Sequence, residues 1–493
     1  MELPSLPRHA RIAATLALFA VAVLSAAVPA AGRGTADPAV ETEELIAEEV
    51  SYRNGDVTVD GTIIAPAATG TGRPGIVLIP GAGEGLPRDF YRPHAEAFAR
   101  AGIVALIYDK RTAAEGYSLF EGSFDDLAGD AIAGVRLLRD RPDVDPDVVG
   151  VHGHSEGGWT AVVAGNRTSD VAFVVASAAS ALPPERTQVW MNQTQLRHAG
   201  VAESLLRPLG ENLTRHVVEA GLFRLAGHDP IPPLERLDQP LLGVFAAYDR
   251  NAPPGESLQL FREALDRGSN THYTLRVIEG ADHLMVRSRD GFDVDLGGVA
   301  RGDLDILADF APGYVETVTG WVHGVADGPA DSSADTSPPQ RYDSTPLPPL
   351  APYESLWMQV AAFGVLVLAF ASYPLTAAVR RLQGRRNPVR TRWPARLLVL
   401  TGLVVPPLTV GYLGYVMITA GREPGPVVAG RPLVWLLLQL AALTVVAATV
   451  VLIARWWHER RRHTPSTNAR FGVLVVGAIV FLPWAAYWGL FAV

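Results

Sequence analysis

Polar and apolar positions are distributed in two different ways on either side of about residue 328. Before it, short apolar runs typical of buried strands are separated by stretches in which apolar residues recur with helical spacing. The runs lie at 75–80, 103–108, 147–152, 171–177, 240–247 and 273–278. This alternation predicts an α/β domain over 45–327, with a mostly parallel sheet and helices on both faces.

Two stretches of the domain depart from this alternation of strand and helix patterns. At its start, alternating segments at 47–53, 56–59 and 62–65 are punctuated by Asn54-Gly55 and Asp60-Gly61. Such dipeptides tolerate positive φ and favour tight turns, so they predict an antiparallel meander at the sheet edge. Residues 182–236 contain helix-like stretches and prolines but no strand pattern, and they predict a helical cap over the active site that shapes substrate entry.

The last third of the chain has the composition of a membrane region. Residues 328–354 are rich in Asp, Ser and Pro and predict a disordered linker. Four apolar segments follow near 356–379, 395–420, 433–454 and 471–493. Each is long enough to cross a bilayer as a helix, which predicts an all-α transmembrane region over 355–493; buried helices of a soluble domain are the alternative.

The N-terminus has the pattern of an export signal. Arg8 and Arg11 precede an apolar run at 12–28, and small residues follow it. This pattern predicts a secretory signal peptide over 1–31 with cleavage near Ala30 or Ala31, or alternatively an uncleaved anchor helix. Either version exports the domain that follows.

The distribution of arginine independently predicts the orientation. Arginines cluster in the first and third connections between the apolar segments, whereas the second connection has only Arg422 and Arg431. Arginine-rich connections stay in the cytoplasm. We therefore expect a multi-pass protein of the cell membrane whose α/β domain is extracytoplasmic.

Overall composition excludes several kinds of chemistry. The 493-residue chain has no cysteine, which rules out disulfides and a cysteine nucleophile. Its formal net charge of −9, with no basic and aromatic stripe, gives no indication of nucleic acid binding. No cofactor is expected. The His-x-His pair His152 and His154 is compatible with a metal, but no third ligand lies nearby in sequence, so no metal site is expected.

The candidate nucleophile follows the apolar run at 147–152. The motif Gly-His-Ser-Glu-Gly-Gly at 153–158 fits the sharp strand-to-helix turn called a nucleophile elbow, with Ser155 projecting from it. Glycines stand two residues before and two residues after the serine, because side chains at Gly153 and Gly157 would clash with neighbouring elements. The alternative is a glycine-rich turn in which Ser155 merely caps a helix.

Two further residues complete a catalytic constellation in chain order. Asp249 and His283 each come just after a predicted strand, where functional groups of parallel sheets collect. His283 would take the proton of Ser155, and Asp249 would orient the imidazole. Asp282 and Asp109 are rival carboxylates, although Asp282 adjoins His283 too closely in sequence to reach its ring easily.

Backbone amides near Ser155 predict an oxyanion hole. The Gly-Ala-Gly-Glu-Gly loop at 81–85 follows the run at 75–80, and the amide of Ala82 or Gly83 would supply one donor. The amide of Glu156, directly after the nucleophile, would supply the other. A phosphate-binding loop is the competing interpretation, but the Gly-Lys-Ser/Thr ending is missing.

With these motifs in place, residues 48–327 resemble a bacterial α/β-hydrolase. They are similar to the branch of dienelactone hydrolases, acyl-thioester hydrolases and small prolyl-oligopeptidase-like serine esterases. The resemblance rests on the motifs at 55–62, 80–83, 108–111, 153–158 and 280–283, together with Asp249 and Pro253-Pro254. After the Asp-Lys-Arg motif, relatives usually continue with Gly-x-Gly, whereas this chain has Thr112-Ala113-Ala114-Glu115-Gly116.

The resemblance implies a serine hydrolase that cleaves carboxylic esters or thioesters through an acyl-enzyme. Its substrate would be a small-molecule or lipid-like acyl compound. A serine peptidase is one alternative. Another is a membrane sensor or transporter accessory protein that binds a ligand without turnover, because a simple anchor needs only one of the four apolar segments.

Overall fold

The computed structural model describes residues 44–68, 70–118, 121–268, 270–328, 330–384 and 392–492. The signal or anchor predicted at 1–31 lies outside these residues. The chain forms two compact units. The sheet unit comprises the described residues of 35–191 and 221–347, and the helical unit comprises 192–220 and 348–492. The division falls within helix α5 (Pro184–His198).

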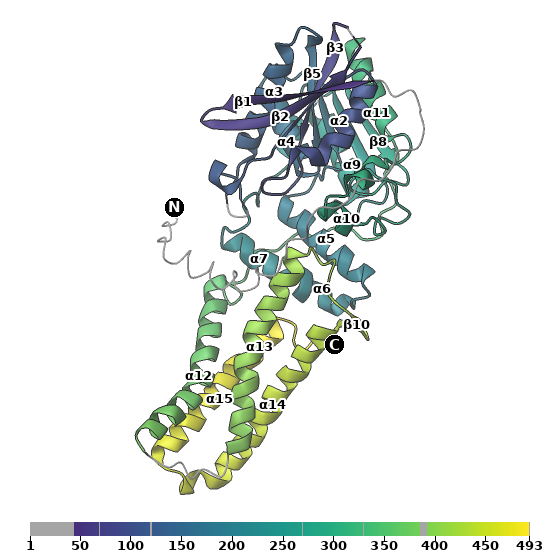
Figure 1. Ribbon diagram of the computed structural model, residues 1–493. Helices are drawn as coiled ribbons and strands as arrows, with labels where there is room; N and C mark the ends of the chain where they lie inside the picture. Colours follow the sequence, from purple (N-terminus) through teal and green to yellow (C-terminus); the bar gives the residue numbers. More distant parts are fainter. Residues whose placement is uncertain are drawn as a thin grey trace, which may run out of the picture. The chain divides into compact units, whose positions relative to one another are not determined.

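The described part of the sheet unit contains a nine-stranded sheet in the order β1-β2-β4-β3-β5-β6-β7-β8-β9 (Figure 1). Strand β2 runs antiparallel to β1 and β4, and the other neighbouring pairs are parallel. The predicted mostly parallel sheet is therefore confirmed. The strands are β1 (Leu45–Asn54), β2 (Val57–Pro66), β3 (Arg73–Ile79), β4 (Val104–Tyr108), β5 (Val144–His154), β6 (Val174–Ser177), β7 (Leu241–Ala246), β8 (Tyr273–Ile278) and β9 (Ser333–Ala334).

Both faces of this sheet are covered by helices, and the alternation of side chains explains how. Val77 and Ile79 of β3 belong to one buried cluster, which also includes residues of α3, α4 and α9. Ile76 and Leu78 belong to another, which includes residues of α2 and α11. Successive strand side chains point to opposite faces, so one apolar strand fills both cores. The helices are α2 (Arg92–Arg100), α3 (Phe124–Arg139), α4 (Glu156–Arg167), α9 (Pro254–Gly268) and α11 (Tyr314–Ala326).

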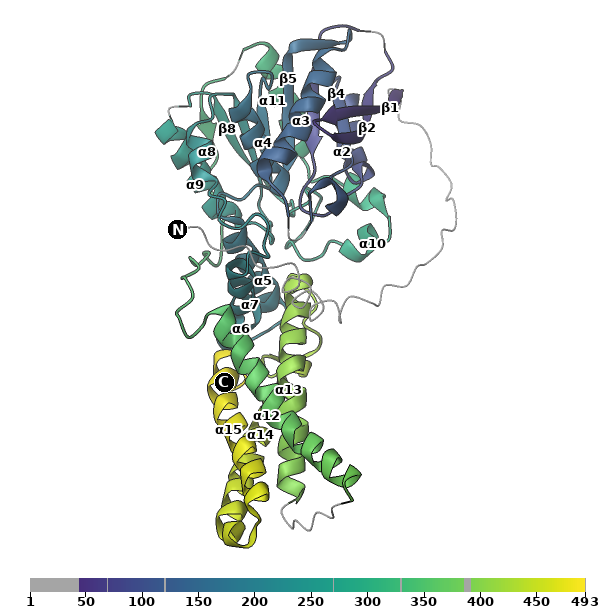
Figure 2. The same cartoon turned by 90° about the vertical axis from the view of Figure 1, so that its left-hand side faces the viewer.

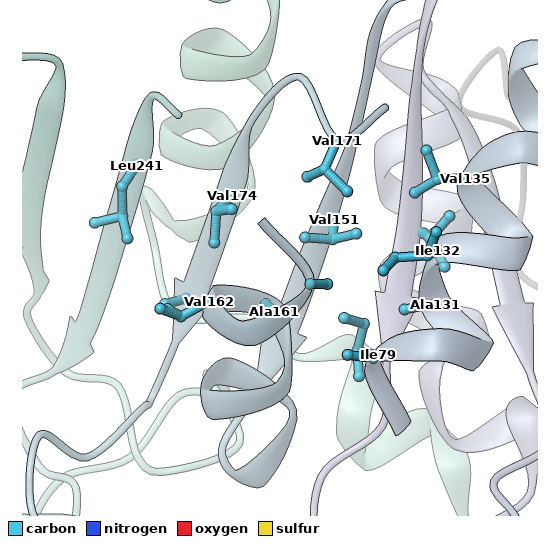
Figure 3. Packing of buried hydrophobic residues seen from close by; sticks show 14 of the residues in the cluster. Ile79, Ala131, Ile132, Val135, Val151, Ala161, Val162, Val171, Val174 and Leu241 are labelled. Carbon is cyan, nitrogen blue, oxygen red and sulfur yellow. The ribbon is translucent and has the colours of Figure 1, made fainter. Parts of the chain in front are cut away.

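Figure 3 shows part of the first cluster, with strand residues such as Ile79 and Val151 packed toward helix residues Ala131 and Ala161. Figure 2 shows α3 and α4 on the same face of the sheet. Shorter helices complete the sheet unit. They are α8 (Ile231–Glu235), α10 (Leu296–Ala300) and the 3-10 helices at Arg88–Tyr91, Ala113–Glu115 and Leu304–Ala308.

The edge of the sheet is simpler than the predicted meander. Gly55 and Asp56 make the turn of a β1–β2 hairpin, directly after Asn54, whereas Asp60-Gly61 lies inside β2. A Cβ at position 61 would lie 2.9 Å from the Ile107 carbonyl oxygen of β4. Gly61 is therefore explained by a close approach of two strands, and the second predicted turn does not form.

The segment at 328–354, predicted as a disordered linker, also differs from expectation where it is described. Ser333–Ala334 forms β9 at the edge of the sheet, beside β8. The Ser344 hydroxyl donates to the Glu256 carboxylate at 2.7 Å, and the Trp190 indole N–H donates to the Tyr342 carbonyl at 2.9 Å. Polar residues that suggested a solvated linker thus make fixed hydrogen bonds along the sheet unit.

The predicted cap is helical, but its middle part groups with the helical unit. Helices α6 (Glu203–Gly210) and α7 (Asn212–Glu219) belong there together with the end of α5. Leu205, Leu206 and Leu209 of α6 share one buried cluster with Trp435 and Phe481 of the long C-terminal helices. The apolar face of α6 therefore packs against those helices rather than within the sheet unit.

Four long helices form the rest of the helical unit (Figure 1). They are α12 (Leu356–Leu382), α13 (Arg392–Ile418), α14 (Leu433–Glu459) and α15 (Pro465–Tyr487). A short hairpin of β10 (Val427–Val428) and β11 (Arg431–Pro432) joins α13 to α14, and a 3-10 turn at Arg460–Arg462 follows α14. All four long helices are apolar enough to cross a membrane, as predicted, and they indicate membrane association.

Candidate active site

Ser155 occupies a strained turn between β5 and α4. Its backbone has φ 56° and ψ −117°, in the positive-φ region that side chains rarely adopt. A Cβ at Gly153 would lie 1.9 Å from the Gly157 carbonyl oxygen, and one at Gly157 would lie 2.3 Å from that of Ile79. The glycines therefore permit the tight packing expected of a nucleophile elbow.

The structure brings the three predicted catalytic side chains together. Ser155 Oγ lies 3.0 Å from His283 Nε2, and His283 Nδ1 lies 2.8 Å from Asp249 Oδ2. Because a carboxylate only accepts, Nδ1 carries the proton and Nε2 is left to accept from the Ser155 hydroxyl. Asp249 is buried, and its Oδ1 accepts from the amides of Asn251 and Ala252, both at 2.8 Å.

Both rival carboxylates have other partners. Asp282 Oδ1 accepts from the amides of Leu284 at 2.9 Å and Val286 at 3.2 Å, so it shapes the loop that carries His283. Asp109 accepts from the backbone amide of Arg88 at 2.8 Å and from its guanidinium at 3.0 Å. Neither contact involves the His283 ring.

The predicted oxyanion donors lie on two elements that meet beside Ser155. Glu156 begins α4, and the first amides of a helix have no acceptor within it. Ala82 and Gly83 lie in the loop after β3. Burial raises the pKa of Tyr117, and the backbone of Gly83 opposes this rise. Because the Gly83 backbone already acts on the Tyr117 hydroxyl, we take Ala82 as the candidate donor.

His154 joins three parts of the site. Its Nε2 lies 2.7 Å from the His283 carbonyl oxygen, so Nε2 must carry the proton. Its Nδ1 accepts from the Tyr91 hydroxyl at 3.2 Å, and that hydroxyl accepts from the Gly81 amide at 2.8 Å. Burial, aided by His283, lowers the pKa of His154 to about 3 and keeps the ring neutral. Sequence analysis considered His154 only as one half of a His-x-His pair.

His152 makes a different contact from its neighbour. Its Nε2 lies 3.0 Å from the Tyr314 hydroxyl, and burial lowers its pKa to about 4. Within the described residues, no group of three or more His, Asp or Glu side chains is arranged to hold a metal ion.

Sequence analysis gave no role to a buried charged cluster beside the elbow. Its members are Lys110, Tyr117, Glu156 and Arg224. Lys110 belongs to the Asp-Lys-Arg motif, and Glu156 belongs to the elbow motif. Both motifs are visible in the sequence, but the pairing of their charges appears only in the fold.

Comparisons with known proteins agree with this architecture. Residues 98–295 match the model of the prolyl oligopeptidase family. Comparison with curated protein sequences gives no match. This match covers two fifths of the chain, and together with the fold and the elbow it supports a serine hydrolase with an α/β-hydrolase fold.

Many solved structures are also similar to the chain. An esterase from Thermogutta terrifontis is 22% identical, with a TM-score of 0.36, covering 54% of this chain and 96% of its own. An esterase from Pyrococcus furiosus is 18% identical with the same TM-score, covering 57% and 97%. An acylaminoacyl peptidase from Pyrococcus horikoshii is 17% identical, again at 0.36, covering 54% and 40%.

Proposed function

We propose that the protein is a membrane-tethered serine esterase or thioesterase that forms an acyl-enzyme on Ser155. The observation that carries this proposal is the unbroken hydrogen-bonded series from Ser155 Oγ through His283 to Asp249. A module that only binds a ligand has no need of this series. The strained conformation of Ser155 supports the same role, because strain at one residue is typical of a reacting group.

In the proposed reaction, Ser155 Oγ attacks the carbonyl carbon of the substrate while His283 Nε2 takes its proton. The carbonyl oxygen becomes an oxyanion, which the amides of Glu156 and Ala82 stabilise. The bond to the alcohol or thiol then breaks, and His283 returns the proton to that leaving group. A water molecule, deprotonated by His283, then attacks the acyl-enzyme; the bond from the acyl carbon to Ser155 Oγ breaks, and His283 returns the proton to Oγ as the acid leaves. Asp249 holds the imidazole in the required tautomer and stabilises its cation.

The first test is labelling of the full-length protein in detergent with a fluorophosphonate probe. We expect the wild type to be labelled and Ser155→Ala to show no labelling. Esters, thioesters and peptide amides of the same acyl group would then be compared. A folded wild type that is neither labelled nor active would contradict the proposal and favour a ligand-binding module. Faster turnover of the amide than of the esters would favour a peptidase.

We also propose that the sheet unit is extracytoplasmic and that the substrate is a small or lipid-like acyl compound. The arginine-rich connections of the helical unit support this orientation. Because the chain has no cysteine, single cysteines report topology cleanly.

In intact cells, a membrane-impermeant thiol reagent should label exposed Asp343→Cys and leave exposed Arg461→Cys unlabelled. In permeabilised cells, the reagent should label both cysteine variants. Labelling of Arg461→Cys alone in intact cells would show that the orientation is the opposite of the proposed one.

A further inference from the structure

A cation and a carboxylate are paired beside the elbow with almost no access to water. Lys110 Nζ lies 2.6 Å from Glu156 Oε1, and the two side chains are 2% and 7% exposed. The same carboxylate accepts from the Tyr117 hydroxyl at 2.5 Å and from Arg224 at 3.1 Å. The reaction outlined above leaves these side chains unused. Burying them costs desolvation free energy, so their contacts call for an explanation.

Lys110 has a second contact that reaches the oxyanion loop. Its ammonium donates to the Gly81 carbonyl oxygen. That carbonyl and the Ala82 N–H belong to one planar trans peptide, so they point in opposite directions. The Gly81 amide, on the preceding peptide, is held by Tyr91. Lys110 and Tyr91 thus fix the orientation of the backbone on both sides of Gly81, and with it the direction of the Ala82 N–H.

The contact between the Lys110 ammonium and the Gly81 carbonyl oxygen also has an electrostatic effect. A cation at the carbonyl oxygen polarises the peptide and makes its N–H a stronger donor, most of all where the dielectric is low. Burial lowers the pKa of Lys110, and Glu156 opposes this effect. Burial raises the pKa of Glu156, but Lys110 and Arg224 outweigh it, and the pKa is lowered. The carboxylate is therefore the group that keeps the ammonium charged at this position.

We propose that Lys110 is a positioning residue that orients and polarises the Ala82 N–H as an oxyanion donor. In this proposal Glu156 contributes to both oxyanion donors, its own amide and the Ala82 N–H. Glu156 supplies one donor from its own main chain and anchors the second through the side chain of Lys110. This inference rests on the proposed function.

The alternative is that Lys110 and Glu156 are only a structural ion pair, and the neighbouring residue provides a matched control. Arg111 pairs with Asp130 at 2.5 Å, with side chains 9% and 1% exposed. Its other contact is with the carbonyl oxygen of Glu115. Breaking either pair leaves a buried carboxylate short of a partner, so both losses should destabilise the protein similarly.

The experiment compares Lys110→Met with Arg111→Met in the full-length protein, using an activated ester. We expect kcat to fall about 10- to 100-fold in Lys110→Met, with KM changed less than about 3-fold, since one lost oxyanion donor costs about 100-fold or more. Arg111→Met should keep kcat within about 3-fold at a comparable loss of Tm. Equal losses of kcat in the two variants, or an unchanged kcat in Lys110→Met, would overturn the inference.

Glu156→Gln provides a second test if Lys110→Met does not fold. Without the carboxylate, the pKa of Lys110 should fall further, so kcat of this variant should decline at a lower alkaline pH than that of the wild type. A pH profile parallel to the wild type would overturn the inference. An inert wild type would overturn the proposed function and this inference with it, whereas an active wild type with insensitive variants would overturn the inference alone.

Discussion

The two units bury apolar side chains by the same physics but present opposite surfaces. Both contain a dense apolar interior. Among the described large apolar residues that are exposed, all except Ile46 and Leu296 lie at residue 353 or beyond. The surface of the sheet unit is thus suited to water, and that of the helical unit is suited to lipid. Interior packing alone does not distinguish the two; the outward side chains do.

The two units also differ in where their buried charged side chains lie. In the sheet unit, charged groups lie within the fold beside Ser155, where Lys110 and Glu156 meet. In the helical unit, the buried ion pair Arg215 and Glu354, 3.1 Å apart, precedes α12 in the chain, whereas the buried Arg470 lies in a candidate span and donates to the Tyr373 carbonyl oxygen. The candidate chemistry is therefore in the sheet unit, which fits our proposal that the helical unit tethers it to the membrane.

The sharpest way to test this division is to remove activity without disturbing the membrane region. We expect Asp249→Asn to lower kcat by about 10⁴-fold, because an amide facing His283 Nδ1 favours the wrong tautomer. Asn can still accept from the amides of Asn251 and Ala252, so the loop should stay folded. Ester turnover and the fraction of protein in the membrane pellet are the measurements.

Asp109→Asn is the control for that variant, because Asp109 pairs with Arg88 rather than with His283. It should retain turnover close to that of the wild type. Normal turnover in Asp249→Asn, or a large loss in Asp109→Asn alone, would transfer the orienting role to another carboxylate.

The second prediction exploits two apolar side chains of nearly equal exposure. Ile46 of β1 is 53% exposed, and Leu443 of α14 is 54% exposed. Ile46→Arg should change the stability by less than about 0.5 kcal/mol, because the residue faces water. Leu443→Arg should disfavour membrane insertion by about 3 kcal/mol. Carbonate-resistant membrane fractions of the two variants measure the difference, and equal fractions would show that α14 does not face lipid.

The sequence was most informative where one physical signal dominated. Apolar runs bounded by turns predicted the parallel strands, because a strand that is buried on both faces must be almost entirely apolar. The elbow motif predicted the tight turn that carries Ser155, because the close approaches at Gly153 and Gly157 admit only glycine. The lengths of the four apolar segments predicted α12 to α15.

The failures occurred where a local signal had two physical explanations. Asp60-Gly61 has the composition of a turn, but Gly61 is needed for the approach of β2 to β4. The segment containing Ser344 has the composition of a linker, but its polar groups bond to Glu256. The roles of Lys110 and His154 depend on contacts between distant segments, which no local pattern encodes.

The last prediction is a pH dependence confined to the sheet unit. Burial raises the pKa of Asp282 from 3.8 to about 6, so the folded state binds this proton more tightly than the unfolded chain does. The resulting stabilisation is fully present below about pH 4 and is lost as the pH rises through 6, a change of about 3 kcal/mol at most. Asp282→Asn cannot ionise, yet its oxygen can still accept from Leu284 and Val286. Relative to this variant, the wild type should therefore lose thermal stability between about pH 4 and pH 7. Heating at each pH followed by fluorophosphonate labelling of Ser155 reports on the sheet unit alone, and parallel curves for the two proteins would show that Asp282 is not the titrating group.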